Sequence, residues 1–397
     1  MTEPLHLAVA LDGAGWHPAA WRLPAARPTE LLTAQYWTEL VQLAESGLLD
    51  FVTLEDALSV QSSRRDAPDE RTDEVRGRLD AVLVAARVAP LTSSIGLVPS
   101  VTVTHTEPFH TSKAIATLDF VSSGRGGWRA QVGRAGDAPH FGRRSIPAVD
   151  PADVHDPEVR QLVTDLFDEA GDYVEVVRRL WDSWEDGAEI RDVTTGRFVD
   201  RDKLHYVDFA GEHFSVRGPS ITPRPPQGQP LVAALAHQAV PYELVGRSAD
   251  LGFVTPTDAA DAGRVLAEIR TAQTAAGRAD ETVHVLGDLV VFLDADEATA
   301  RARRDRLDER AGEAFTSDAA VFVGTPSGLA DLVAEWTQAG LSGLRLRPAT
   351  LPHDLRQVTT ALVPELQRRG LFRTAYEAST LRGHLGLPRP ANRYAAV

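Results

Sequence analysis

Short apolar runs alternate with longer segments of helical period along most of the chain. The apolar runs predict buried strands at residues 5–11, 50–54, 94–98, 126–132, 231–235, 251–254, 283–293 and 343–347. Between them lie helical patterns such as residues 31–46, where Tyr36, Leu40 and Leu43 share one face and Gly47 ends the helix. The alternation predicts βαβ units and a parallel sheet. About seven or eight units fit either a closed eight-stranded barrel or a doubly wound open sheet, and periodicity does not choose between them.

Two stretches, residues 133–158 and 186–229, interrupt this alternation. The first loses its periodicity, and the second contains a predicted hairpin around Gly211 and ends in a proline-rich run. A helix is predicted over residues 161–184 between them, and further helices over 297–314, 327–339 and 354–369. We interpret the two stretches as insertions, after the fourth strand and before the fifth, within a single domain that covers residues 1–397.

Composition and charge narrow the class of protein. Hydrophobic residues make up 43% of the 397 residues, enough to bury a large core. Acidic residues outnumber basic ones by 56 to 41, and the net charge of −15 disfavours nucleic acid and anionic lipid as partners. The absence of cysteine excludes disulfides, thiolate catalysis and Cys-ligated zinc, and the 12 histidines show no metal-binding spacing. From these residues we expect no bound metal. No apolar run reaches the roughly 18 residues of a membrane helix, so we expect a cytoplasmic enzyme.

Familiar catalytic motifs of hydrolases and kinases are missing from the sequence, including the Walker phosphate loop and the Gly-x-Ser-x-Gly elbow. Enzymes built on a barrel place their chemistry at the C-terminal ends of the strands. The polar residues that follow the predicted strands are therefore the ones to inspect, and they lie at 12–17, 55–56, 102–105, 129–133 and 236–238.

Several segments, in collinear order from about Leu7 to Pro390, resemble the nitrilotriacetate and dibenzothiophene-sulfone monooxygenases of the luciferase-like flavin-dependent superfamily. Residues 15–22, Gly-Trp-His-Pro-Ala-Ala-Trp-Arg, look like the family's His-x-x-Ala-Trp-Arg opening. Residues 117–128, Thr-Leu-Asp-Phe-Val-Ser-Ser-Gly-Arg-Gly-Gly-Trp, resemble its Leu-Asp-x-x-Ser-x-Gly-Arg-x-Gly-Trp segment. Similar likenesses cover residues 36–51, 180–186, 363–373 and 380–387.

The resemblance implies a (β/α)₈ TIM-like barrel with insertions and a two-component monooxygenase. In such an enzyme a separate NAD(P)H-dependent flavin reductase supplies reduced FMN, and molecular oxygen oxygenates a small organic substrate. The chemistry requires a dry pocket around the flavin ring. The family likeness also implies a homodimer.

The family's flavin-binding residues transfer unevenly to this sequence. Its aspartate after the second strand falls on Asp56, and its Ser/Thr after the third falls on Thr102, whose hydroxyl can donate to a flavin oxygen. Its His-x-x-x-Tyr pair near the phosphate falls on Val163 and Phe167, which lack a donor, and its phosphate-side serine falls on Gln238.

Other departures fall on the same cofactor region. Arg129 replaces the family's usual Asn, Val132 and Gly133 replace its Thr-Ser, and Pro241 ends its phosphate turn. Positive charge from Arg129, Arg134 or His237 offers a compensation. His17 is the candidate for substrate or peroxide contact, with a structural loop histidine as the alternative. Two other functions stay open: a deazaflavin-dependent hydride transfer, and a noncatalytic barrel that has lost flavin binding.

Overall fold

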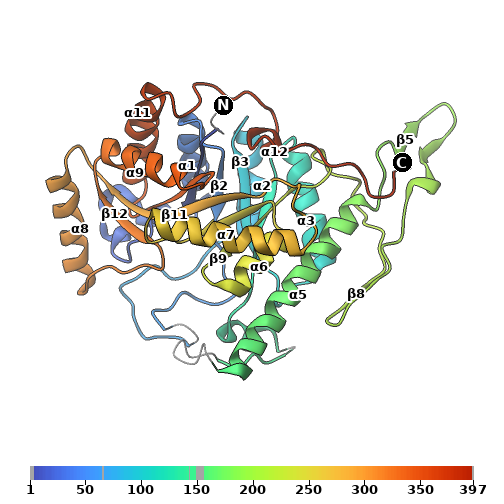
Figure 1. Cartoon of the computed structure of the whole chain (residues 1–397), viewed down its shortest axis with the longest axis horizontal. Helices are drawn as coiled ribbons and strands as arrows, with labels where there is room; N and C mark the ends of the chain where they lie inside the picture. The colour runs from blue at the N-terminus through green and yellow to red at the C-terminus, as the bar shows by residue number, and fades with distance from the viewer. Residues whose placement is uncertain (1–3, 65–66, 143, 149–155, 396–397) are drawn as a thin grey trace.

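Strand pairing closes the central sheet into a barrel. The computed structural model describes residues 4–64, 67–142, 144–148 and 156–395. The eight barrel strands are all parallel, and they are β1 (His6–Leu11), β2 (Phe51–Leu54), β3 (Gly96–Thr102), β4 (Gly127–Gln131), β9 (Leu231–Ala236), β10 (Leu251–Val254), β11 (His284–Leu293) and β13 (Gly343–Pro348). β13 pairs with β1 in the register Gly343 to His6, which closes the ring (Figure 1). The structure therefore confirms the TIM-like barrel and excludes the open sheet.

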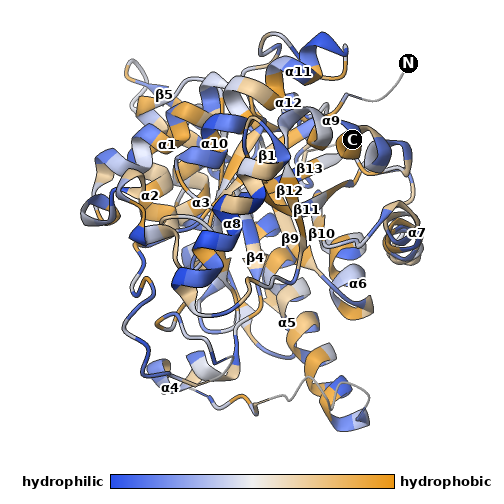
Figure 2. Ribbon diagram, turned by 90° about the vertical axis from the view of Figure 1, so that its left-hand side faces the viewer, coloured by the Kyte–Doolittle hydropathy of each residue, from blue (hydrophilic) through white to orange (hydrophobic). Residues whose placement is uncertain are grey.

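Helices surround the barrel and cover the outward faces of its strands. They are α1 (Ala34–Ser46), α2 (Ala81–Val88), α3 (Pro108–Val121), α5 (Pro157–Asp182), α6 (Ala239–Ser248), α7 (Ala259–Ala275), α8 (Glu297–Ala311) and α9 (Pro326–Gln338). Side-chain caps fix several of their starts; Thr33 accepts from the Tyr36 N–H at α1, and Asp80 accepts from the Leu83 N–H at α2. In α8 only Ala300 and Leu307 are buried, and Figure 2 shows this helix as largely hydrophilic.

Two details of the predicted elements are wrong. A short strand, β12 (Ala320–Gly324), was not predicted; it pairs with Leu289–Leu293 of β11, and only Gly324 of its residues is buried, so it forms no buried apolar run. The single helix predicted over 354–369 is interrupted by a π-helical turn, Val358–Leu362, between α10 (His353–Gln357) and α11 (Val363–Arg368). Pro364 has no N–H to continue the regular ladder, so the helix cannot remain uniform there.

Both predicted insertions lie between β4 and β9, the fourth and fifth barrel strands. The first contains a 3₁₀ turn, Ala135–Asp137, and α4 (Ala138–Phe141); residues 143 and 149–155 of the predicted segment lie outside the described residues. The second contains two hairpins, β5 (Glu189–Asp192) with β6 (Arg197–Val199), and β7 (Phe209–Ala210) with β8 (Ser215–Val216), the latter confirming the hairpin predicted around Gly211. In Figure 1 the second insertion projects from the barrel beside the C-terminal segment, to which it is joined by the Asp186–Arg389 ion pair.

The barrel interior is apolar near the N-terminal ends of the strands and polar near their C-terminal ends. The apolar part includes Ala8, Phe51, Val98, Phe253 and Leu286. It is closed by α12 (Leu381–His384) and the residues after it, because Leu381, Leu385 and Leu387 belong to the same cluster. The C-terminal end, called the mouth below, is where a barrel enzyme carries its site.

Candidate active site at the mouth of the barrel

Strands β3 and β4 present polar side chains to the barrel interior. Trp128 of β4 packs outward against Tyr173 of α5, and side chains alternate along a strand, so Arg129 points inward. Ser100 of β3 is in register with Arg129, and Thr102 is in register with Gln131. Paired residues of parallel strands share a face, so these four side chains line one sector of the mouth.

Arg129 is held in this sector by a buried carboxylate. Its Nη2 donates to Oε2 of Glu55 at 2.6 Å and to Oε1 of Gln131 at 2.8 Å. Burial alone would raise the pKa of Glu55, but the positive charges of Arg129 and Arg345 hold that pKa below its usual value. Glu55 is therefore ionised at neutral pH and orients the guanidinium of Arg129.

A second buried ion cluster fills the opposite side of the mouth. Arg345 and Arg347 of β13 both donate to the carboxylate of Asp288 in β11, with Arg345 Nε at 2.7 Å from Oδ1 and Arg347 Nε at 2.9 Å from Oδ2. Arg345 Nη1 also reaches Glu55 Oε1 at 3.3 Å, which joins the two clusters. All three side chains of the Arg345–Asp288–Arg347 cluster are almost completely buried. Such pairing offsets the large cost of removing charges from water.

The sequence analysis did not single out Arg345, Arg347 or Asp288. The signal available was a charged residue at alternate positions of an otherwise apolar strand, as in Gly343-Leu344-Arg345-Leu346-Arg347. Charged residues at alternate positions of a strand lie on one face of it. They indicate a buried charge cluster only once that face is known to point into a barrel.

Asp56 and Thr102, the two predicted ring-side residues, lie at the ends of neighbouring strands. The carboxylate of Asp56 accepts from its own loop, at the Ala57 N–H, and from the Ala81 N–H at the start of α2. Burial raises the pKa of Asp56. Thr102 is buried, and its hydroxyl makes no hydrogen bond to the described residues. Thr102 is thus the freer of the two to bind a ligand.

His237 and Gln238 lie between the end of β9 and the start of α6. Nδ1 of His237 is 2.8 Å from Oγ1 of Thr255, and its Nε2 is 3.4 Å from Oδ2 of Asp318. Burial lowers the pKa of His237, while Asp318 acts in the opposite direction. Gln238 is the N-cap residue of α6, and its side chain makes no capping hydrogen bond.

Val163 and Phe167 both lie on α5, one helical turn apart, and both are half-buried. Phe167 packs against the main hydrophobic core. Because α5 packs against α6, these two side chains belong to the region where the family resemblance expects the phosphate. Neither offers a hydrogen-bond donor.

His17 is buried in the loop after β1 and uses both ring nitrogens within the protein. Nδ1 accepts from the Ala19 N–H at 3.1 Å, so Nε2 carries the proton that it shares with Asp308 at 3.0 Å. Its ring also packs against Phe292 and Phe315. Neither hydrogen bond joins His17 to the clusters at the mouth. A substrate contact by His17 stays a prediction, and it would require one of these bonds to be exchanged.

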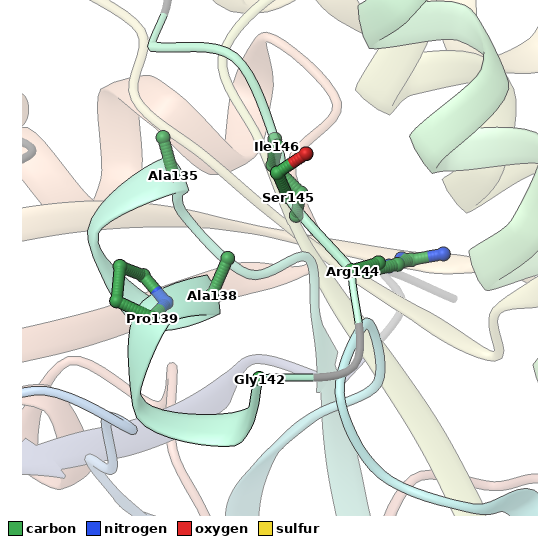
Figure 3. A pocket seen from close by; sticks show the side chains of 7 residues that line it. All are labelled: Ala135, Ala138, Pro139, Gly142, Arg144, Ser145 and Ile146. Atoms are coloured by element: carbon green, nitrogen blue, oxygen red, sulfur yellow. The ribbon is translucent and has the colours of Figure 1, made fainter.

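A cavity of about 370 Å³ lies in the first insertion (Figure 3). Its lining is mostly small or apolar, and it consists of Ala135, Ala138, Pro139, Gly142, Arg144, Ser145 and Ile146. Arg144 extends toward α5, where its Nη2 donates to Glu169 Oε2 at 2.7 Å.

Within the described ranges no group of three or more His, Asp or Glu side chains is arranged to hold a metal ion. In the same residues no helix has the length and apolarity needed to cross a membrane.

Comparison with known proteins identifies the family. The sequence matches the luciferase-like monooxygenase family over residues 16–312. It is 30% identical to nitrilotriacetate monooxygenase component A of Aminobacter aminovorans, over 99% of this chain and 98% of that protein. It is 26% identical to dibenzothiophene-sulfone monooxygenase of Rhodococcus erythropolis, over 94% of this chain and 93% of that protein. The structure is similar to that of a long-chain alkane monooxygenase, with a TM-score of 0.85 and 23% identity over 97% of this chain and 96% of the other.

The chain therefore belongs to the luciferase-like monooxygenase family and is a flavin-dependent monooxygenase. Buried polar atoms without partners show whether its residues fit a flavin. Ser100 Oγ and Arg129 Nε make no hydrogen bond to any described residue, and Thr102 lies two residues beyond Ser100 on the same face of β3. A flavin ring carries carbonyl oxygens and ring nitrogens along one edge, which such donors satisfy. The donor set of β3 and β4 fits the ring of a flavin.

Proposed function

We propose that this chain is the oxygenating component of a two-component monooxygenase that uses reduced FMN and O₂ to oxygenate a small organic substrate. A separate NAD(P)H-dependent flavin reductase supplies the reduced FMN. The observation that carries the proposal is the pair of buried inward donors without a partner among the described residues, Ser100 Oγ and Arg129 Nε, beside Thr102 at the mouth of a luciferase-like barrel. A relative that aligns over nearly its full length is named as component A of its monooxygenase, which supports a separate reductase.

The residues of β3 and β4 would hold the polar edge of the flavin ring. Reduced flavin, when bound, supplies the electrons that activate O₂. Thr102 and Ser100 donate from their hydroxyls, and Arg129 donates from Nε while Glu55 fixes its other end. The apolar layer below, with Phe51 and Phe253, keeps water out of the barrel interior.

The phosphate would lie at the start of α6, near the first backbone N–H groups. His237 adjoins them, and a contact from its ring would replace the bond to Thr255 or the pairing with Asp318. This region is weaker than the ring side, because Pro241 offers no N–H and neither Val163 nor Phe167 carries a donor. Most of the affinity for FMN should therefore come from contacts with the ring.

The cavity of the first insertion is the proposed site for part of the substrate. Its apolar side chains, such as Ala135, Ala138 and Ile146, favour an apolar group of modest size. The proposal also includes a cytoplasmic location and a homodimer. Size-exclusion chromatography with light scattering measures the mass of the particle in solution and so tests the homodimer.

An anaerobic titration tests the proposal. Reduced FMN, oxidised FMN and a deazaflavin are each added to the purified chain, and flavin fluorescence and calorimetry report binding. We expect reduced FMN to bind with at least micromolar affinity. A purified flavin reductase with NADH and O₂ should then support turnover when a panel of small sulfur and amine compounds is supplied. Binding of the deazaflavin alone would favour hydride transfer, and binding of none of the three would remove the proposal.

A further inference from the structure

His105 is a buried side chain at the mouth with an unsatisfied polar atom. It follows β3, three residues after Thr102, and is only 8% exposed. Its Nε2 makes no hydrogen bond with any described residue. Burying a ring nitrogen without a partner is unfavourable, and a ligand that enters the barrel mouth would satisfy it.

Neighbouring residues fix the position of this imidazole. It stacks flat on Phe141 of α4, with ring centroids 5.1 Å apart and an interplanar angle of 2°. A Cβ at Gly133 would lie 3.2 Å from both His105 Cδ2 and Thr102 Cγ2. His105 and Thr102 therefore flank the same point, and glycine at position 133 leaves room for the ring. The family resemblance places a serine at that position.

Burial of the His105 ring favours its neutral form. Burial lowers the pKa of His105, and Arg144 acts in the same direction, whereas Asp137 and Glu169 oppose them. A neutral imidazole can present an N–H at Nε2 to an acceptor oxygen or a bare nitrogen to a donor. Either suits the polar edge of a flavin ring.

We propose that His105 Nε2 makes a hydrogen bond to the ring system of the bound flavin, beside Thr102, and that Phe141 and Gly133 position the imidazole for it. The proposal rests on the proposed function and deepens it by adding a ring contact set by the first insertion. The ring is favoured over the phosphate because His105 adjoins Thr102, whereas the start of α6 follows β9, on the other side of β4. A contact with the substrate alone is the competing outcome.

Three variants test this contact. His105→Leu removes the hydrogen bond, His105→Gln returns an amide group near the place of Nε2, and His110→Gln is the matched control because His110 is exposed on α3. Each is titrated anaerobically with reduced FMN and with reduced riboflavin, which lacks the phosphate. We expect His105→Leu to weaken the binding of both flavins about tenfold. His105→Gln should recover most of the lost affinity, and His110→Gln should bind both flavins as the wild type does.

Thermal unfolding without flavin separates a binding role from a structural one. Because His105→Leu removes an unsatisfied buried atom, its Tm should equal or exceed that of the wild type. Unchanged flavin affinity in His105→Leu, with the wild type binding normally, would overturn the proposed contact. A loss seen for FMN but not for riboflavin would also overturn it, since it would place His105 at the phosphate. Failure of the wild type to bind any flavin would instead overturn the proposed function, and this inference with it.

Discussion

Arg129 and Glu55 form a buried ion pair inside the barrel, with 2.6 Å between Nη2 and Oε2. The pair joins β4 to the end of β2 and leaves Nε of Arg129 without a hydrogen-bond partner among the described residues. One end of the guanidinium is thus fixed and the other is available.

Glu55→Gln should weaken the binding of reduced FMN by tenfold or more, because the charge that orients Arg129 is lost. Arg345 loses a partner in the same change, so we expect the free energy of unfolding to fall by about 3 kcal/mol. Anaerobic fluorescence titration and urea unfolding measure the two effects. Glu335→Gln, at an exposed position on α9, is the control and should change neither. Unaltered flavin affinity in Glu55→Gln would show that Arg129 is not a flavin ligand.

Thr102→Val should weaken flavin binding about tenfold and leave the stability of the flavin-free protein nearly unchanged. Valine and threonine have similar shapes, and the buried Thr102 hydroxyl makes no hydrogen bond to a described residue that the change would remove. Thr102→Ser keeps the hydroxyl and should bind flavin like the wild type. Titration with reduced FMN and a thermal melt of each variant provide the comparison; equal binding by the Val and Ser variants would contradict the assigned contact.

FMN and riboflavin should bind with affinities within about tenfold of each other, because Val163 and Phe167 give the phosphate no donor. The double variant Val163→His with Phe167→Tyr returns the two donors that the family resemblance expects. The double variant should raise the affinity for FMN about tenfold and leave the affinity for riboflavin unchanged. Calorimetry of both ligands with both proteins makes the test. A large preference of the wild type for FMN would mean that other residues hold the phosphate.

Asp288→Ala should lower the free energy of unfolding by about 3–5 kcal/mol, because Arg345 and Arg347 would remain buried without their shared carboxylate. Urea unfolding followed by tryptophan fluorescence measures the change. Asp331→Ala removes a surface carboxylate that pairs with Arg369 and should cost less than 1 kcal/mol. Similar losses in the two variants would show that the buried cluster does not stabilise the barrel.

Asp250 should contribute stability that acid removes. Burial alone would raise the pKa of this carboxyl, but Arg178 and Arg382 lower it to about 2 from an ordinary value of 3.8. A carboxyl whose pKa is lower in the folded protein than in the unfolded chain stabilises the fold at pH values above its ordinary pKa. This contribution is lost as the pH falls from about 4 toward 2. Asp250→Asn should therefore be about 2 kcal/mol less stable at pH 7. Urea unfolding at pH 7 and pH 3 should show the difference shrinking in acid; a constant difference would contradict this assignment.

The sequence by itself determined the order of the eight barrel strands, most of the helices between them, the two insertions and the polar residues that follow the strands. These are local properties, since the period of apolar positions reflects how each segment meets its own neighbours. Asp56, Thr102 and Arg129 could be found in this way, because strand ends share one edge of any parallel sheet. The segments at residues 15–22 and 117–128 added the family and its flavin.

Only the tertiary structure decided that the sheet closes, because closure depends on β1 meeting β13 across more than three hundred residues of chain. Closure also places Glu55, Arg129, Arg345 and Asp288 in one enclosed space, where charges must pair. The same packing turned His17 toward Asp308 and His105 toward Phe141. Which polar atom is satisfied within the chain and which is left for a ligand depends on three-dimensional neighbours, and a linear pattern does not contain them.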